Sequence, residues 1–178
     1  MPIEKATLGG GCFWCLDAVY RKLDGVQSST CGYAGGHKPD PTYREVCSGT
    51  TGHAEVVQVE YDTDKMSYRD ILEVFFTIHD PTTKDRQGAD VGSQYRSIIL
   101  THDEAQAEVG RELVSELTKE RVFSKPIVTD IGSLEKFWRA EEHHQDYYAN
   151  HPGEGYCAAV IAPKLAKFRK RWAERLKA

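Results

Sequence analysis

The sequence predicts a two-layer α/β (α+β) sandwich, with strands in one layer and helices in the other, formed by a single domain over residues 1–178. Segments with the alternating apolar pattern of strands are interspersed with segments whose apolar residues have helical spacing. A chain of 178 residues, 40% of them hydrophobic, can bury one substantial core but not comfortably two. We find no internal repeat and no low-complexity tract.

The first half of the chain predicts three strands and two helices. Three glycines, Gly9–Gly11, separate the first strand from the first helix, so Cys12 stands where that helix begins. Ser67 and Asp70 have the spacing of a capping box at the start of the second helix. The expected elements are a strand near 6–8, a helix over 13–23, strands over 26–34 and 53–62, and a helix that begins after Ser67.

The second half begins with "DPTTKDRQGADVGSQY" (80–95), a long polar loop of the kind that often carries function. Thr101 and Glu104 have the spacing of a helix cap. The expected elements are a strand over 97–101, a helix capped by Thr101, a strand over 126–131, and helices over 133–150 and 163–176. The irregular segment "HPGEGYC" separates the last two helices.

Charge and hydropathy indicate which partners and which compartment to expect. The net charge of -4 gives no general attraction to nucleic acid or acidic lipid. The last fifteen residues are basic around an apolar stripe, which favours a docked helix with a solvated cationic face over a nucleic-acid-binding helix. No leader opens the chain, and no apolar run approaches the roughly 20 residues of a membrane span. We expect a cytoplasmic monomer without nucleic-acid or membrane partners.

The five cysteines, at positions 12, 15, 31, 47 and 157, are an odd number, so at least one thiol is free. Cys12 is distinguished by its place at a helix N-terminus, where unpaired N–H groups and the helix dipole favour the thiolate. The glycines before it allow a substrate to approach closely. Adjacent helical positions cannot both face the core, so at least one of Phe13 and Trp14 should be exposed beside Cys12 as an apolar wall. Together these features predict that Cys12 is a nucleophile.

Other interpretations of Cys12 stay open on the motif alone. A cysteine in an apolar turn is often a buried structural residue. Cys12 and Cys15 have the C-x-x-C spacing of zinc ligands, although no second tight pair is present. Further ligands for a zinc-binding interaction module would be Cys31, Cys47, His37 and His53. A thioredoxin-like redox pair has its tryptophan before the first cysteine, whereas Trp14 lies between the two.

Several long motifs cover nearly the whole chain: "GGGCFWC", "GYAGG", "PTYREVCSGTTGHAEVVQVEYD", "HDPTTKDRQGADVGSQYRS", "AEEHHQDYY" and "GYCAAVIAPKLAKF". On these motifs the chain resembles the peptide methionine sulfoxide reductases of the A class, which reduce one sulfoxide epimer of methionine. The resemblance implies an α/β sandwich with a ferredoxin-like core and the reduction of methionine-S-sulfoxide, free or in proteins, as a repair of oxidative damage. It also implies thioredoxin as the external reductant, and neither a metal nor an organic cofactor.

The resemblance assigns roles to individual residues. Cys12 resembles the nucleophile that attacks the sulfoxide sulfur, and Glu55 resembles the acid. The residues that would hold the S-methyl group are Phe13 and Trp14, and the polar pocket for the sulfoxide oxygen would comprise Tyr43, Tyr95 and Asp90. A sulfoxide sulfur is a poor electrophile until its oxygen is protonated or strongly hydrogen-bonded. Glu55 must therefore be neutral when it acts, which apolar surroundings would favour.

The resemblance also indicates how the enzyme would be recycled. Cys157, in "GYC", resembles the thiol that condenses with the sulfenic acid on Cys12 to form a disulfide. Cys15, three residues from Cys12, is the alternative. We interpret Cys31 and Cys47 as structural thiols.

Two positions depart from the family's usual residues. Asp17 stands where glutamate is usual, and His143 stands where tyrosine is common. Neither change removes a reacting group.

The alternative to a reductase is the zinc-binding interaction module described above. Metal analysis of the purified protein would distinguish the two, because the module would contain stoichiometric zinc.

Overall fold

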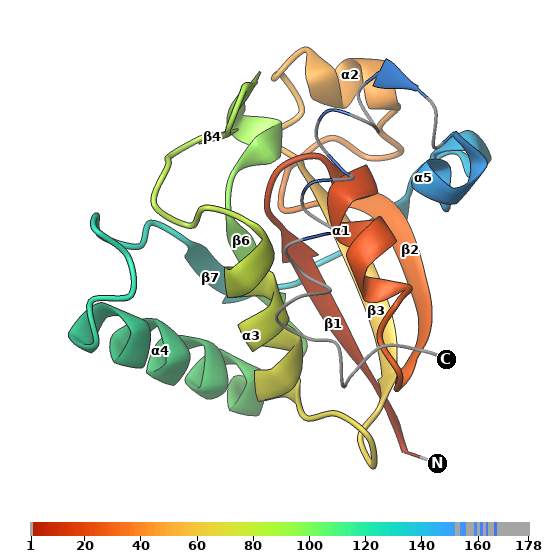
Figure 1. The fold of residues 1–178 in the computed structure, drawn as a ribbon. Helices are drawn as coiled ribbons and strands as arrows, with labels where there is room; N and C mark the ends of the chain where they lie inside the picture. Colours follow the sequence, from red (N-terminus) through yellow and green to blue (C-terminus); the bar gives the residue numbers. More distant parts are fainter. Residues whose placement is uncertain are drawn as a thin grey trace.

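The structure is a computed structural model of the chain and describes residues 2–151 together with residues 154, 155, 159, 161, 163 and 166 (Figure 1). In this part of the chain the strands are β1 (Ile3–Gly9), β2 (Val26–Ala34), β3 (Ala54–Asp62), β4 (Arg86–Gln87), β5 (Asp90–Val91), β6 (Ile98–Thr101), β7 (Asp130–Ser133) and β8 (Phe137–Arg139). The α-helices are α1 (Phe13–Tyr20), α2 (Tyr43–Cys47), α3 (Tyr68–Ile78), α4 (Glu104–Lys119) and α5 (Tyr147–Asn150). Short 3-10 helices are η1 (Ser93–Tyr95) and η2 (Glu142–His144).

The main sheet has six strands in the order β7-β6-β1-β3-β2-β8. The four central strands, β6, β1, β3 and β2, are antiparallel to one another, with Leu8 opposite Val57 and Tyr33 opposite Glu55. With α1 and α3 these strands follow the order β-α-β-β-α-β along the chain, which is the ferredoxin-like arrangement. β7 adds to one edge in parallel with β6, and β8 adds to the other edge antiparallel to β2. The predicted two-layer α/β class is confirmed.

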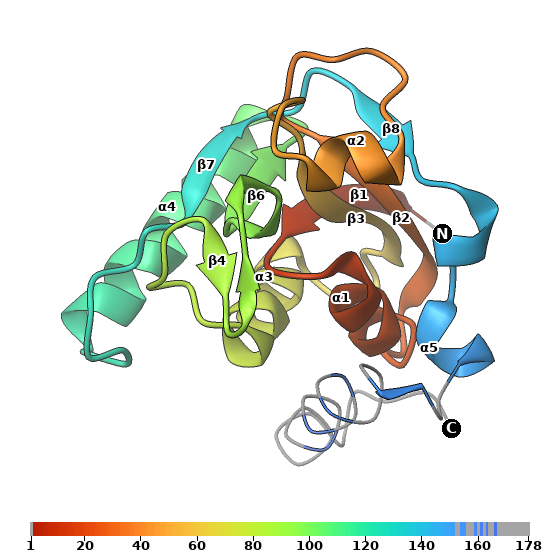
Figure 2. The same ribbon diagram turned by 90° about the horizontal axis from the view of Figure 1, so that it is seen from above.

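Helices cover one face of the sheet. α1 and α3 lie along the same side of it in Figures 1 and 2, and α4 packs against α3, β6 and β7. The main core lies between this helical layer and the sheet, with Phe13, Tyr20 and Phe75 among its largest side chains. A smaller apolar cluster on the opposite face comprises Ala34, Ala54, Val56, Ile98 and Leu100, covered by Leu134 and Phe137. The start of α1 therefore lies at the rim of the main core.

Side-chain caps define where the two longest helices begin. The predicted capping box of α3 is confirmed, because Ser67 Oγ accepts from the N–H of Asp70 and Asp70 Oδ2 accepts from the N–H of Ser67. The predicted cap of α4, Thr101 with Glu104, is wrong. Thr101 is a buried residue at the end of β6, and Asp103 caps the helix by accepting a backbone hydrogen bond of 2.8 Å.

The chain between β7 and α5 differs most from its prediction. The strand expected over 126–131 begins only at Asp130, and the helix expected over 133–150 is replaced by β8, η2 and α5. Long-range contacts outweigh the local helical spacing here. The side-chain amide of Gln145 bonds both the N–H (2.8 Å) and the C=O (3.0 Å) of Cys31 on β2.

The helix predicted over 13–23 is shorter than expected, and the helix predicted over 163–176 falls mostly outside the described residues. α1 ends at Tyr20 instead of Leu23, because the chain tightens into a turn in which the N–H of Leu23 donates to the carbonyl of Tyr20 (3.2 Å). The helix expected over 163–176, with the basic tail, lies outside the described residues apart from 163 and 166. Among the described residues, no helix is both long and apolar enough to cross a membrane.

Candidate active site

Cys12 is the residue that precedes α1, at the end of the glycine turn. Its backbone is extended (φ -63°, ψ 130°), its side chain makes no capping bond, and it is 5% exposed. Gly11 has φ +92°, and its N–H donates to the carbonyl of Tyr95 at 3.2 Å. A Cβ on Gly10 would lie 2.9 Å from the ring of His79. The turn is thus enclosed by two other segments, which fixes the position of Cys12.

The thiol of Cys12 is less acidic than its position in the sequence predicts. Burial raises its pKa well above the ordinary value, and the neighbouring Cys15 thiol and Glu55 raise it further. The backbone N–H of Trp14 lowers this pKa, as expected at a helix N-terminus. Desolvation outweighs that effect, so the pKa of the Cys12 thiol lies above its ordinary value, opposite to the direction expected from its place at the helix N-terminus.

Glu55 is a fully buried carboxyl group on β3. Its Oε1 accepts a 3.1 Å hydrogen bond from the N–H of Phe13, and its Oε2 has no hydrogen-bond partner in the described chain. Burial raises the pKa of Glu55 to about 8, with Asp90 and Cys15 acting in the same direction and the Phe13 N–H opposing them. At neutral pH the carboxyl group is therefore mostly protonated, as a proton donor must be.

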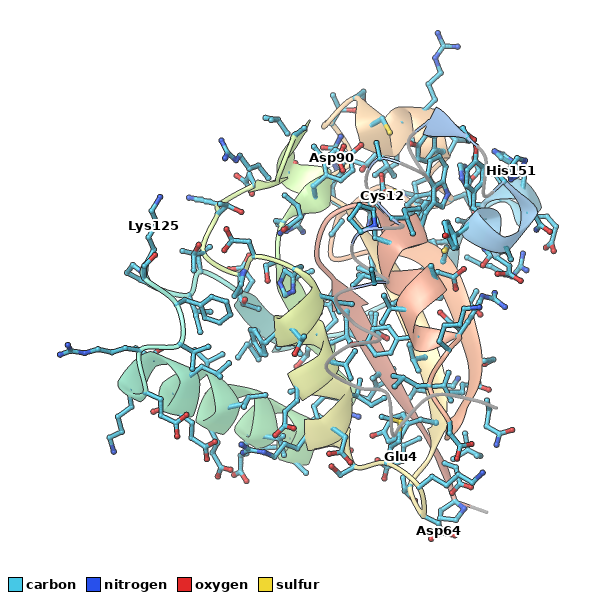
Figure 3. The ribbon with its side chains drawn as sticks, in the orientation of Figure 1. Glu4, Cys12, Asp64, Asp90, Lys125 and His151 are labelled. Carbon is cyan, nitrogen blue, oxygen red and sulfur yellow. The ribbon has the colours of Figure 1, made fainter. Side chains whose placement is uncertain are left out.

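Two tyrosines and an aspartate lie around Glu55. Tyr43 on α2 and Tyr95 on η1 are half-buried, and burial followed by the charge of Glu55 raises the pKa of each. Asp90 comes from β5, and Figure 3 shows it at the same end of the molecule as Cys12. The structure therefore brings the predicted nucleophile, acid and oxygen-pocket residues together from separate elements.

Cys47 also belongs to this cluster, although the sequence indicated only a structural thiol. Tyr43 and Cys47 are four residues apart on α2, a spacing that places both side chains on one face. Burial raises the pKa of Cys47 above its ordinary value, and hydrogen bonds from the hydroxyl groups of Tyr43 and Tyr95 to the Cys47 sulfur oppose this rise. Recognition of the short helix α2 in the sequence would have revealed this neighbour.

Phe13 and Trp14 form the apolar side of the site. Phe13 is fully buried and Trp14 is half-buried, so neither is fully exposed as expected, and Trp14 is the one of the two that keeps some exposed surface. The indole of Trp14 stacks on Tyr147 with ring centroids 3.8 Å apart and an interplanar angle of 6°. Its Nε1–H donates to Nδ1 of His144 at 3.2 Å. Burial, with His143 acting in the same direction, lowers the pKa of His144 to about 4, so this ring is neutral and can accept the bond.

Residues 141–147 contribute to the site in a way that the sequence did not predict, because a helix was expected there. Glu141 accepts hydrogen bonds from the hydroxyl of Tyr33 (2.9 Å) and from the N–H of Tyr43 (3.1 Å). His144 and Tyr147 hold Trp14 as described above. The motif "AEEHHQDYY" marked this segment, but only the fold shows which partners it reaches.

Comparisons with known proteins agree with this geometry. The model of the family "Peptide methionine sulfoxide reductase" matches residues 4–176. The chain belongs to the peptide methionine sulfoxide reductase family. The enzyme MsrA of Natronomonas pharaonis is 57% identical over 171 residues, which cover 96% of each chain. That of Polynucleobacter asymbioticus is 54% identical over 170 residues, which cover 96% of this chain and 90% of the relative.

Solved structures support the same assignment for this reductase. Reduced Mxr1 from Saccharomyces cerevisiae has a TM-score of 0.82 at 35% identity, over 87% of this chain and 89% of that one. The methionine sulfoxide reductase A of Corynebacterium diphtheriae has a TM-score of 0.77 at 33% identity, over 88% and 78% of the two chains. As a member of this family the protein is an oxidoreductase that acts on methionine sulfoxide.

The other cysteines of the reductase differ in their access to Cys12. Cys15 is 2% exposed, its N–H bonds the Cys12 carbonyl at 3.1 Å, and its thiol hydrogen-bonds to that of Cys12. Cys31 is fully buried, with its Sγ 3.8 Å from the carbonyl oxygen of Phe13. The predicted resolving thiol, Cys157, lies outside the described residues.

The residues considered as zinc ligands do not gather into one site in the described part of the reductase, although Cys12 and Cys15 are in contact. In the described part of the chain, no three His, Cys, Asp or Glu side chains come together as ligands for a metal ion.

Both ring nitrogens of His53 form hydrogen bonds with backbone groups. Nδ1 accepts from the N–H of Gly36 (3.0 Å), and Nε2 donates to the carbonyl of Lys38 (2.7 Å). His53 thereby holds the loop after β2 against the residues that lead into Glu55.

Proposed function

We propose that this protein reduces methionine-S-sulfoxide, free or in proteins, to methionine through thiol chemistry at Cys12, and so repairs oxidised proteins. One observation carries the proposal: Glu55, a fully buried acid with a pKa of about 8, lies beside Cys12 with one carboxyl oxygen unpartnered in the described chain. A protonated carboxyl next to a thiol supplies both groups that a sulfoxide needs.

The first step transfers oxygen from the substrate to the enzyme. As Glu55 protonates the sulfoxide oxygen, the Cys12 sulfur attacks the sulfoxide sulfur, and the thiol proton passes to the carboxylate that Glu55 leaves behind. The S–S bond made by this attack then breaks, with its electron pair left on the methionine sulfur, as the oxygen passes from that sulfur to Cys12. Methionine leaves and Cys12 becomes a sulfenic acid, so the thiol is oxidised by two electrons and the sulfoxide is reduced by two. The hydroxyl groups of Tyr43 and Tyr95, with Asp90 nearby, hold the oxygen during the transfer. Phe13 and Trp14 receive the S-methyl group.

A second thiol then restores the enzyme. The thiol of Cys157 condenses with the sulfenic acid on Cys12, which releases water and forms a disulfide that thioredoxin reduces. Cys15 is the alternative resolving thiol, because it already hydrogen-bonds to Cys12. Support for the reductant comes from a solved structure of Mxr1 in complex with Trx2, which has a TM-score of 0.58 at 27% identity over 82% of this chain.

The remaining features of the proposed enzyme follow its chemistry. The chain acts as a single domain of residues 1–178 and as a monomer. It uses no metal or organic cofactor, because thiols supply the electrons and Glu55 supplies the proton. Free thiols and thioredoxin suit a reducing compartment such as the cytoplasm.

A direct assay tests the proposal. The purified full-length protein is incubated with both epimers of methionine sulfoxide and dithiothreitol, and the products are followed by chiral chromatography. We expect the S epimer alone to disappear, because the methyl wall and the oxygen pocket fix which face of sulfur meets Cys12. The Cys12→Ser variant should be inactive, since a neutral hydroxyl is a far weaker nucleophile than a thiol close to its base. Equal loss of both epimers, or an active Cys12→Ser variant, would contradict the proposed site.

A further inference from the structure

α1 carries a buried carboxylate that the proposed reaction does not use. Asp17 lies three residues beyond Trp14, so both side chains project from neighbouring positions on the helix. The side chain of Asp17 is 1% exposed. Burial raises its pKa and the charge of Arg21 lowers it. A buried carboxyl group needs partners for its oxygens, and these partners lead to the aromatic wall of the site.

Both oxygens of Asp17 are bonded. Oδ1 accepts from Nε of Arg21 at 2.9 Å, and Oδ2 accepts from the backbone N–H of Asp146 at 3.0 Å. Arg21 is fixed in turn, because its second guanidinium nitrogen donates to the carbonyl of Ser29 at 2.8 Å. Asp17 therefore attaches a residue 129 positions later in the chain directly to α1.

Asp146 precedes Tyr147, the first residue of α5, and the chain turns at Asp146 so that the Tyr147 ring lies against Trp14. It has φ 51° and ψ 40°, the left-handed region, which is uncommon for residues other than glycine but open to aspartate and which turns the chain sharply here. The next ring, that of Tyr147, stacks on Trp14 at 3.8 Å and 6°. Gln145 fixes the chain one residue earlier, through Cys31, but the N–H of the turning residue itself is bonded by Asp17.

We propose that Asp17 is a positioning residue for the methyl-binding wall. By holding the N–H of Asp146, Asp17 keeps Tyr147 face to face with Trp14 and so fixes the plane of the indole that receives the S-methyl group. Asp17 acts through Asp146 and Tyr147, and it is not a catalytic residue. The inference rests on the proposed function for the identity of the group that binds at Trp14.

Fluorescence of Trp14 tests the structural half of this proposal without substrate. In a Trp138→Phe/Trp172→Phe background, Trp14 is the remaining tryptophan of the chain. We expect Asp17→Ala to shift the emission of Trp14 to longer wavelength and to increase its quenching by acrylamide, because an indole released from Tyr147 is more exposed to water. Asp62→Ala is the matched control, since Asp62 is also a buried aspartate that accepts a backbone N–H (2.9 Å from Asp64) but lies at the far end of β3. That control should leave the emission of Trp14 unchanged.

Kinetics test the functional half. In the full-length enzyme, Asp17→Ala should raise KM for methionine-S-sulfoxide about tenfold and lower kcat much less, because the wall contributes to binding in both ground and transition states. Tyr147→Ala should have a similar effect, and the double variant should be no worse than either single variant, because both changes remove the same support. Asp17→Asn keeps the shape of the side chain and is the variant to use if Asp17→Ala does not fold. Because an amide oxygen is a weaker acceptor than a carboxylate, Asp17→Asn should change the Trp14 emission and KM in the same direction as Asp17→Ala, but by less.

The outcomes separate this inference from the proposed function. Unchanged Trp14 emission and KM in a folded Asp17 variant would overturn the positioning role, as would effects of Asp17→Ala and Tyr147→Ala that multiply. A wild-type protein without reductase activity would instead overturn the proposed function, while a shift of Trp14 emission in Asp17→Ala would still support the link from Asp17 to the indole.

Discussion

The backbone N–H of Phe13 donates a 3.1 Å hydrogen bond to Oε1 of Glu55. This bond joins the first residue of α1, directly after the proposed nucleophile, to a central strand of the sheet. The proposed nucleophile and acid are therefore held against each other by a helix and a strand, which position side chains more rigidly than loops do. Oε1 is occupied by the backbone, and Oε2, unpartnered in the described chain, is the oxygen left for the proposed proton transfer.

Glu55→Gln should lower the rate of the reductase step by a factor of order 10² or more, since the amide keeps the shape but has no proton to transfer. Methionine released in a single turnover, measured by rapid quench, reports this step apart from recycling. An unchanged rate would move the acid role to another group, with Asp90 the next candidate.

The pKa of Glu55 also predicts how stability depends on pH. Because its pKa is raised to about 8 in the folded protein, the native state keeps a proton that the unfolded chain loses near pH 4.5. The contribution of protonated Glu55 to the free energy of unfolding is therefore fully present below about pH 4.5, and it is lost as pH rises through about 8. The loss at alkaline pH should be on the order of 5 kcal/mol for a shift of this size.

Glu55→Gln should remove this loss, so the variant gains stability relative to wild type between pH 5 and pH 9 even though its activity falls. Urea unfolding at both pH values measures the change, and comparing the two cancels any constant cost of the amide. Glu112→Gln, at an exposed position on α4, is the control and should follow wild type. Parallel pH dependences in wild type and Glu55→Gln would show that the carboxyl group is ionised in the native state.

The resolving thiol can be separated from the nucleophile by substitution. Cys157→Ser should release one equivalent of methionine at about the normal rate, because the oxygen transfer is complete before Cys157 acts, while thioredoxin-driven turnover collapses. Dithiothreitol should partly restore turnover by reducing the sulfenic acid directly. Peptide mapping after one oxidation cycle should find Cys12 joined to Cys157. Cys15→Ser is the matched control and should keep thioredoxin turnover; a Cys12–Cys15 disulfide would reverse the two roles.

Gly36→Ala should destabilise the protein by about 3 kcal/mol or more, as other overpacked sites do. A Cβ at this position would lie 2.3 Å from the backbone nitrogen of His53 and 2.5 Å from the carbonyl carbon of Gly52. The strand and loop would have to separate just before Glu55. Gly132→Ala on β7 is the control, because a Cβ there meets no heavy atom within 4 Å, and its midpoint of urea unfolding should stay near that of wild type. Equal midpoints for the two variants would contradict this packing.

The sequence by itself determined the elements that depend on local chemistry. Strand alternation gave β2 and β3 their positions, the Ser67 and Asp70 pair marked the start of α3, and the glycine turn put Cys12 at the N-terminus of α1. Each of these signals acts over a few residues, so it can be read without knowledge of the fold. The roles of acid and oxygen pocket instead came from the resemblance of longer motifs to a known family, and they stay predictions.

Only the tertiary structure decided the properties that depend on burial and on partners far along the chain. The helix dipole at Cys12 was visible in the sequence, but the desolvation that outweighs it was not, and the same desolvation keeps Glu55 protonated. Residues 141–147 have helical spacing, yet bonds to β2 and to Asp17 fix them in another conformation. Local spacing contains no information on these contacts, because a pKa and a long-range hydrogen bond depend on what the folded chain places around each group.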